Sequence, residues 1–315
     1  MKKVFFVVII SIITLHNIYS QEEATYNFLR LDADAKSAAL AGSYVSAQND
    51  VNSIFYNPAG LATIKQPQLS AGFFKYLMDI NSGNAAYAMK YKNLGYFGIG
   101  VKYVNYGTFD KVDENFVNQG TFSANDLAVS LGYANTYAEN LHYGANVKFI
   151  YSNIDEFKST GLAVDLGLLY DIPSYLASVG ISLMNAGTQL STYNGVNEKL
   201  PLDLRIGAMK RLEYLPVTVY LGINNMTADR DKFIQHFKNF TIGGEFELND
   251  YFLIRAGYDN QIRQNLETGN STGLGGFSAG LGLQYQNTYM LDYSFNSIGK
   301  VGSVHRINLK YNFNK

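Results

Sequence analysis

The side chains that could do chemistry in this 315-residue chain are few and are not arranged for catalysis. It contains four histidines, His16, His142, His236 and His305, and no cysteine. No histidine stands at zinc-ligand spacing from another metal-binding side chain, so no metal site is predicted. No serine combines a Gly-x-Ser-x-Gly setting with a credible base. The sequence therefore predicts no enzyme, no metal and no cofactor.

Acidic residues and glycines recur on the polar side of alternating segments. Asp165 and Asp292 lie far apart in sequence, and we expect each to balance Lys or Arg on a neighbouring strand. The pairs Gly98-Ile99-Gly100 and Gly280-Leu281-Gly282 precede no helix, so they are read as strand glycines and not as phosphate loops. Such glycines leave room on the polar face, either for the N-terminal segment or for strand curvature.

The elements that carry these residues alternate apolar with small or polar residues from about residue 68 to 313. Period two is typical of a strand with two unlike faces. About fourteen strands are predicted, each near the roughly 9–11 residues of a tilted transmembrane strand. They lie near 68–76, 85–92, 95–105, 124–135, 141–152, 161–171, 177–185, 201–211, 215–224, 239–248, 251–259, 275–285, 288–296 and 304–313.

The chemistry of the two faces decides which side meets lipid. One face carries residues such as Leu162, Val164 and Leu166, and the other carries Lys148 and Asp165. A Lys or Arg facing lipid at the bilayer midplane costs roughly 2–4 kcal/mol, so the charged face should line a lumen. We predict an all-β, closed antiparallel transmembrane barrel. A soluble sandwich has the same period with its apolar faces inside, but strand length and strand number favour the barrel.

The connections support an even strand number, because short and longer ones alternate along the chain. This places both termini in the periplasm and the longer loops outside the cell. Short connections are predicted near 93–94, 136–140, 172–176, 212–214, 249–250 and 286–287, and longer ones near 77–84, 106–123, 153–160, 186–200, 225–238, 260–274 and 297–303.

The start of the chain is unlike the strands. Lys2 and Lys3 precede an apolar stretch too short to span a bilayer, which predicts an export signal over 1–20. Residues 21–67 are too apolar for a free linker and are predicted to plug the barrel formed by 68–315. The plug contains Asn57-Pro58-Ala59-Gly60, in which Pro58 keeps Asn57 out of the helical region and Gly60 permits a sharp turn.

Two of the longer loops carry apolar side chains among polar ones. Phe109 and Phe116 lie in 106–123, and Phe233 and Phe237 lie in 225–238. Exposed apolar residues with a polar rim predict docking of a partner. The alternative is that these side chains pack on one another across the barrel mouth. The formal net charge of −1 gives no reason to expect nucleic acid.

Several motifs, in this order and spacing, give the mature chain a resemblance to the PorV/PorQ family of outer-membrane barrels, itself similar to the fourteen-strand long-chain fatty-acid transporters. Within that family the chain looks more like PorQ. The motifs are Phe28-Leu29-Arg30-Leu31, Ala38-Ala39-Leu40-Ala41-Gly42, Tyr56-Asn57-Pro58-Ala59-Gly60-Leu61, Tyr106-Gly107-Thr108-Phe109, Gly144-Ala145-Asn146-Val147-Lys148, Arg255-Ala256-Gly257-Tyr258 and His305-Arg306.

The resemblance implies a role in the outer membrane as the anchor of a type IX secretion system attachment complex. Its partners would be membrane lipid and PorZ-, PorU- or PorV-like surface proteins. One alternative is a FadL-like transporter of hydrophobic small molecules. Another is a PorV-like shuttle for secreted cargo.

Overall fold

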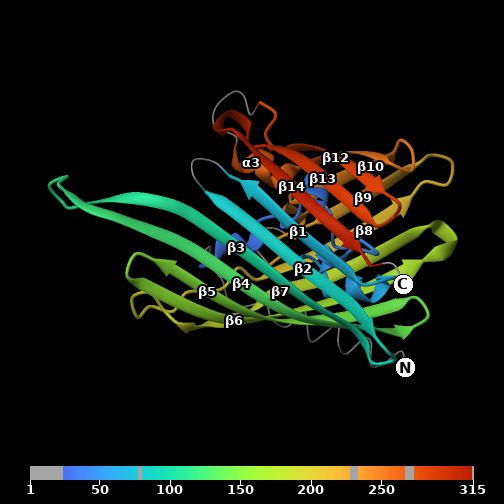
Figure 1. Cartoon of the computed structure of the whole chain (residues 1–315), viewed down its shortest axis with the longest axis horizontal. Coiled ribbons are helices and arrows are strands. Elements are labelled where there is room, and N and C mark those ends of the chain that lie inside the picture. Colours follow the sequence, from blue (N-terminus) through green and yellow to red (C-terminus); the bar gives the residue numbers. More distant parts are fainter. Residues whose placement is uncertain (1–23, 77–79, 228–232, 267–272, 314–315) are drawn as a thin grey trace.

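A computed structural model describes residues 24–76, 80–227, 233–266 and 273–313 of the chain (Figure 1). Fourteen antiparallel strands close into one barrel, each pairing with its neighbours in sequence, and β1 pairs with β14. The predicted all-β, closed fourteen-strand barrel with an N-terminal plug is confirmed. The strands are β1 (Gln68–Lys75), β2 (Asn81–Tyr91), β3 (Gly95–Val112), β4 (Asn118–Ala138), β5 (Leu141–Ile154), β6 (Phe157–Ile172), β7 (Ala177–Ser191), β8 (Asp203–Arg211), β9 (Val217–Ile223), β10 (Phe240–Glu247), β11 (Phe252–Asp259), β12 (Phe277–Tyr285), β13 (Tyr289–Ser297) and β14 (Ser303–Asn312).

The barrel wall is apolar outside and polar inside. Leu131, at the centre of the wall-forming part of β4, is 60% exposed, and Val147 and Ile307 are exposed on the same outer surface. Asp165 and Arg255 are buried on the inner surface. This polarity is the reverse of a soluble sandwich and suits a wall surrounded by lipid. Rings gather at the short-turn end, where Tyr311 contacts both Tyr289 and Phe313, as expected for a membrane–water boundary.

The β3–β4 connection differs from the expected loop over residues 106–123. Both strands continue past the barrel rim as a two-stranded ribbon, and only residues 113–117 form the turn. Figure 1 shows this ribbon projecting well beyond the other hairpins. The ribbon forms because strand pairing between β3 and β4 resumes after a register shift following Asn105, which pairs with Asn81, the first residue of β2.

Loop length alternates less regularly than the sequence indicated. β5 and β6 extend so far that only Asp155 and Glu156 separate them, which is shorter than most connections at the opposite end. The side on which a hairpin lies is therefore set by strand order and not by loop length. Short helices occupy other connections: η4 (Pro173–Tyr175), η5 (Phe233–Lys238), α3 (Asn260–Asn265) and η6 (Gly299–Val301).

The N-terminal segment fills the lumen with four short helical turns. These are η1 (Asn27–Arg30), α2 (Ala35–Ala39), η2 (Val51–Phe55) and η3 (Pro58–Thr63), and Figure 1 shows them in blue behind the strands of the wall. Leu40, Val51, Ile54 and Leu61 in this plug are fully buried. Within the described residues, no helix is long and apolar enough to cross a membrane. The predicted export signal over 1–20 lies outside the described residues.

Candidate functional site

The lumen of the barrel is the candidate site, and the predicted plug motif Asn57-Pro58-Ala59-Gly60 lies within it. Asn57 caps η3 by accepting the backbone N–H of Ala59 at 3.1 Å, and Pro58 follows at the first helical position. The amide of Asn57 donates to Val45 O at 2.8 Å and to Leu168 O of β6 at 3.0 Å. Asn57 therefore ties two parts of the plug to each other and to the wall.

Gly60 acts differently from the expected turn residue. Its φ is not positive, so its conformation does not require glycine. Its backbone instead lies against Ser53, so that a Cβ on Gly60 would lie 2.6 Å from the Ser53 Cβ. The missing side chain lets η2 and η3 pack closely within the plug.

The wall glycines face the plug. A Cβ on Gly144 would lie 2.5 Å from the Pro58 carbonyl carbon, and one on Gly100 would lie 2.8 Å from the Phe55 ring. Gly207 faces Val45, and Gly243 faces Leu40. Such distances leave no room for a side chain. The inner surface of the wall is therefore shaped to the N-terminal segment.

Two ion pairs hold the plug to the strands. The ammonium of Lys36 lies 3.3 Å from Glu245 Oε2 on β10, and Lys310 of β14 lies 2.7 Å from Asp50 Oδ2. All four groups are buried or nearly so, and breaking one partner of a buried pair is strongly destabilising. Neutral hydrogen bonds add to these contacts, as where Asn146 of β5 donates to Ile54 O at 2.8 Å.

The two acidic caps of the plug have opposite electrostatic environments. Burial would raise the pKa of Asp50, but Lys310 and Lys36 outweigh it and lower the pKa to about 2. Asp34 caps α2, and burial together with the charge of Asp50 raises its pKa to about 6. The Asp34 Oδ2 atom has no hydrogen-bond partner among the described residues. The folded protein therefore favours the protonated form of Asp34 over the ionised form more strongly than the unfolded chain does.

The plug lies between two cavities. One, of about 230 Å³, opens at the long-loop end, where Tyr76, Asn224 and Ser297 leave their strands. The other, of about 450 Å³, opens at the short-turn end and is lined by Gln68, Asn287 and other polar residues. Plug residues belong to both linings, with Gly42 in the first and Lys36 in the second.

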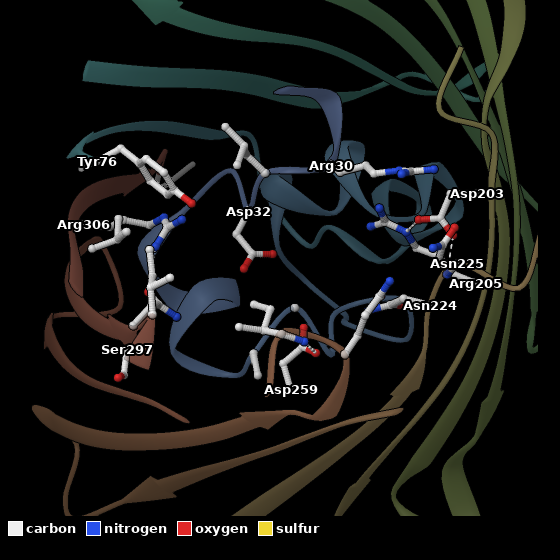
Figure 2. A pocket seen from close by; sticks show the side chains of 18 residues that line it. Arg30, Asp32, Tyr76, Asp203, Arg205, Asn224, Asn225, Asp259, Ser297 and Arg306 are labelled. Atoms are coloured by element: carbon white, nitrogen blue, oxygen red, sulfur yellow. Dashed lines mark hydrogen bonds and ion pairs between the residues drawn. The ribbon is translucent and has the colours of Figure 1, made fainter. Parts of the chain in front are cut away.

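The first cavity is charged (Figure 2). Three arginines and three aspartates line it, together with the larger aliphatic side chains of Leu31, Ile262, Ile298 and Val304. Sequence reasoning missed this group. Arg306 was noted only as part of the His305-Arg306 motif, and nothing in the sequence indicated that it shares a cavity with distant residues. The charged lining comprises Arg30, Arg205, Arg306, Asp32, Asp203 and Asp259.

The predicted docking residues lie in two elements, the β3–β4 ribbon and η5. Phe116 at the ribbon turn is 88% exposed, and Phe109 stacks on Phe122 with ring centroids 5.3 Å apart. Phe237 lies in η5 and is exposed; Phe233 begins η5, and its side chain lies outside the described residues. The docking role of these four residues stays a prediction.

The described histidines and the one serine in a Gly-x-Ser-x-Gly setting have structural partners. His142 lies between Thr136 and Asp171, at 2.9 and 3.0 Å. Ser278 donates to the plug carbonyl of Ala39 at 3.0 Å. No group of three metal-binding side chains occurs among the described residues.

The plugged fourteen-strand barrel defines the class, an outer-membrane β-barrel protein. The sequence model described as outer membrane protein transport protein (OMPP1/FadL/TodX) matches residues 30–315, and the chain belongs to that family. No curated protein matches the chain.

Solved structures share the fold at low sequence identity. The toluene transporter TbuX of Ralstonia pickettii has a TM-score of 0.61 and 13% identity, covering 90% of this chain and 99% of that one. The toluene transporter TodX of Pseudomonas putida has a TM-score of 0.60 and 14% identity, covering 89% and 97%. A FadL homologue of Pseudomonas aeruginosa has a TM-score of 0.56 and 10% identity, covering 90% and 98%.

These findings correct the expected family. The PorV/PorQ assignment is wrong, and with it the type IX secretion anchor, the PorV-like shuttle and the PorZ-, PorU- or PorV-like partners. The motifs behind that assignment include Pro58-Ala59 and Gly144, which are in contact where the plug meets the wall. Such residues determine how the plug packs against the barrel wall. They carry no information about what the protein exports or anchors.

Proposed function

We propose that this protein lets small, largely hydrophobic molecules cross the outer membrane, with the plug as the gate. The proposal rests mainly on the two cavities of the lumen, which lie on opposite sides of the plug. The chain also belongs to a family described as outer membrane transport proteins. Related folds include proteins described as toluene transporters. Polar groups of the wall hold the plug in place: Asn146, Ser278 and Lys310 all contact it.

A reversible lock tests the gate. A Cβ on Gly207 would lie 3.0 Å from the Val45 Cβ, slightly short of the roughly 3.5–4.5 Å found in disulfides. The V45C/G207C pair should therefore cross-link plug to wall with a small outward adjustment. We expect cells that carry the oxidised protein in a lipopolysaccharide-containing outer membrane to lose uptake of radiolabelled toluene and to regain it with reductant. The single variants V45C and G207C are the controls. Equal uptake in the oxidised and reduced forms would show that plug displacement is not needed.

The orientation is also part of the proposal, with both termini in the periplasm and the β3–β4 ribbon outside the cell. The chain has no cysteine, so a single introduced thiol is a unique label. N115C lies in the β3–β4 turn, and N287C lies in the β12–β13 turn at the opposite end. A membrane-impermeant maleimide applied to whole cells should label N115C and not N287C. The reverse labelling would invert the proposed orientation.

A further inference from the structure

Four asparagines on neighbouring strands stand in one row across the barrel wall. Asn105 of β3 pairs with Asn81 of β2 and with Asn125 of β4, and Asn125 pairs in turn with Asn153 of β5. Lys158 of β6 continues this asparagine row beyond Asn153. Asparagine is depleted in strands, so its presence at the same register position of four strands calls for a physical reason.

The side chains of the asparagine row point away from the lumen. Successive side chains of a strand lie on opposite faces of the sheet. Beside each asparagine stands a residue that is at most 7% exposed and faces the lumen: Ser82, Val104, Asp126 and Ser152. The four amides therefore lie on the outer surface of the wall.

The asparagine row lies at the edge of the apolar outer surface. Two residues further along the same face, Leu127 pairs with Tyr103 and with Tyr151, which is a step of about 7 Å along the strands. Tyrosine is typical of a membrane–water boundary. On the other side of the row, the register shift after Asn105 begins the β3–β4 ribbon. The amides therefore follow directly on the surface assigned to lipid, at its long-loop end.

These amides need hydrogen-bond partners of both kinds. Each asparagine side chain carries two N–H donors and an acceptor oxygen. Asn105 Oδ1 accepts the backbone N–H of Gly107 at 2.7 Å, whereas the side chains of Asn125 and Asn153 make no hydrogen bond to a residue that the structure describes. A phosphatidylcholine head group offers only acceptors. A sugar hydroxyl both donates and accepts, as a serine hydroxyl does, so it matches the amide fully.

We propose that the asparagine row binds the sugar head groups of glycolipids, whose acyl chains lie on the adjoining apolar wall. Neighbouring strands lie about 4.8 Å apart, so Asn105, Asn125 and Asn153 together span about 10 Å, enough for a head group of two sugar rings. In the proposed orientation this end of the barrel lies in the outer leaflet, which contains lipopolysaccharide. The inference concerns the lipid around the barrel and goes beyond the proposed transport through its lumen.

A fluorescent reporter beside the row tests the lipid preference. The chain contains no tryptophan, so L127W provides a unique fluorophore next to Asn125. L168W is the matched control, because Leu168 is an outward residue, 44% exposed, near the short-turn end of β6. Each protein is folded into bilayers that mix dibrominated phosphatidylcholine, which quenches tryptophan, with unbrominated digalactosyldiacylglycerol. Neither lipid carries a net charge, so the comparison isolates the sugar hydroxyls.

We expect L127W to be quenched less than the lipid ratio predicts, corresponding to an about threefold preference for the galactolipid, as one net hydrogen bond would give. L168W should show no preference. Equal enrichment of galactolipid at the two reporters, or none at either, overturns the proposal.

A pair of variants in the L127W background assigns the amides. Threonine and valine have nearly the same shape and both favour strands, but only threonine carries a hydroxyl that donates and accepts. N125T/N153T should keep most of the preference, and N125V/N153V should lose it. N115V is the control, because Asn115 lies in the β3–β4 turn outside the row. The heat-modifiable gel shift confirms that each variant is folded. The same galactolipid preference in the threonine and valine variants contradicts the hydrogen-bonding role.

This proposal and the transport function fail separately. The quenching measurement involves neither toluene nor movement of the plug. Loss of the lipid preference therefore leaves the V45C/G207C result standing, and an ineffective lock leaves the asparagine row standing.

Discussion

At the scale of single residues, the seating of the plug in the barrel depends on positions that carry no side chain. Some wall glycines, such as Gly144 and Gly180, admit the plug backbone so closely that an added methyl group would meet main-chain atoms, which cannot rotate away as a side chain can. Gly144 is the clearest case, because its neighbour is the peptide between Pro58 and Ala59. Conformational freedom is not the reason, since Gly144 does not have positive φ.

Substituting Gly144→Ala should lower the free energy of unfolding by about 1–3 kcal/mol through overpacking against η3. Urea unfolding in lipid vesicles measures the change, and limited proteolysis reports release of the plug. Gly244→Ala is the matched control, because a Cβ on Gly244 meets nothing within 4 Å. Equal stability of the two variants would mean that the plug yields without strain.

A pH dependence follows from Asp34. Its folded-state pKa of about 6 lies above the ordinary value of 3.8, so the folded protein binds this proton more tightly than the unfolded chain. Stability from this group should rise, by roughly 1–3 kcal/mol, as pH falls through 6 toward 4. D34N should be more stable at pH 7.5 and should lack this rise. Asp50, with a pKa of about 2, does not titrate in that window. A D34N profile parallel to the natural protein would refute the assignment.

At the scale of elements, the β3–β4 ribbon contributes little to the stability of the barrel. Beyond Asn105 the ribbon strands pair with each other, and an exposed ion pair between Lys111 and Asp155 links them to the β5–β6 turn. Exposed ion pairs contribute little to stability. The ribbon presents Phe116 and its neighbours far from the wall, so it is the element in which partner docking is most simply sought.

Replacing residues 110–121 by an Asn-Gly turn should leave the barrel intact. Phe109 and Phe122 are already cross-strand partners, and Asn-Gly suits a two-residue hairpin. The variant should keep the heat-modifiable gel shift and thermal midpoint of the natural protein within about 2 °C, since it removes only exposed contacts. A much lower midpoint would show that the ribbon supports the wall. Loss of a cross-linked partner from whole cells, with the midpoint unchanged, would support the docking prediction.

At the scale of the whole molecule, the inverted polarity of the wall commits the chain to lipid. The outer surface carries Leu131, Val147 and Ile307 where a soluble protein would carry charge, and the charges are gathered around the plug. The same inversion gives the lumen enough polar groups to bind a plug and to leave a charged cavity above it.

Introducing a charge on the outer wall tests this commitment. Leu131→Arg should destabilise the barrel in vesicles by about 2–4 kcal/mol, because its side chain lies near mid-wall among lipid chains. Val112→Arg is the control, since Val112 is exposed on the ribbon beyond the wall. Urea titration of folding into phospholipid vesicles measures both. Equal tolerance of arginine at the two positions would argue against a lipid-facing wall at Leu131.

The sequence by itself determined the strands, their number, their two faces and the plug, because each depends on local periodicity or on motifs only a few residues long. The tertiary structure decided the rest. The ribbon exists because β3 and β4 extend beyond their other partners, β2 and β5. The β5–β6 loop is short because strand pairing continues to Ile154 and Phe157. The charged cavity joins Arg30, Tyr76 and Arg306, which barrel closure and plug insertion bring together across most of the chain. Alternation tells which way a side chain points, but only closure of the barrel determines what it meets there.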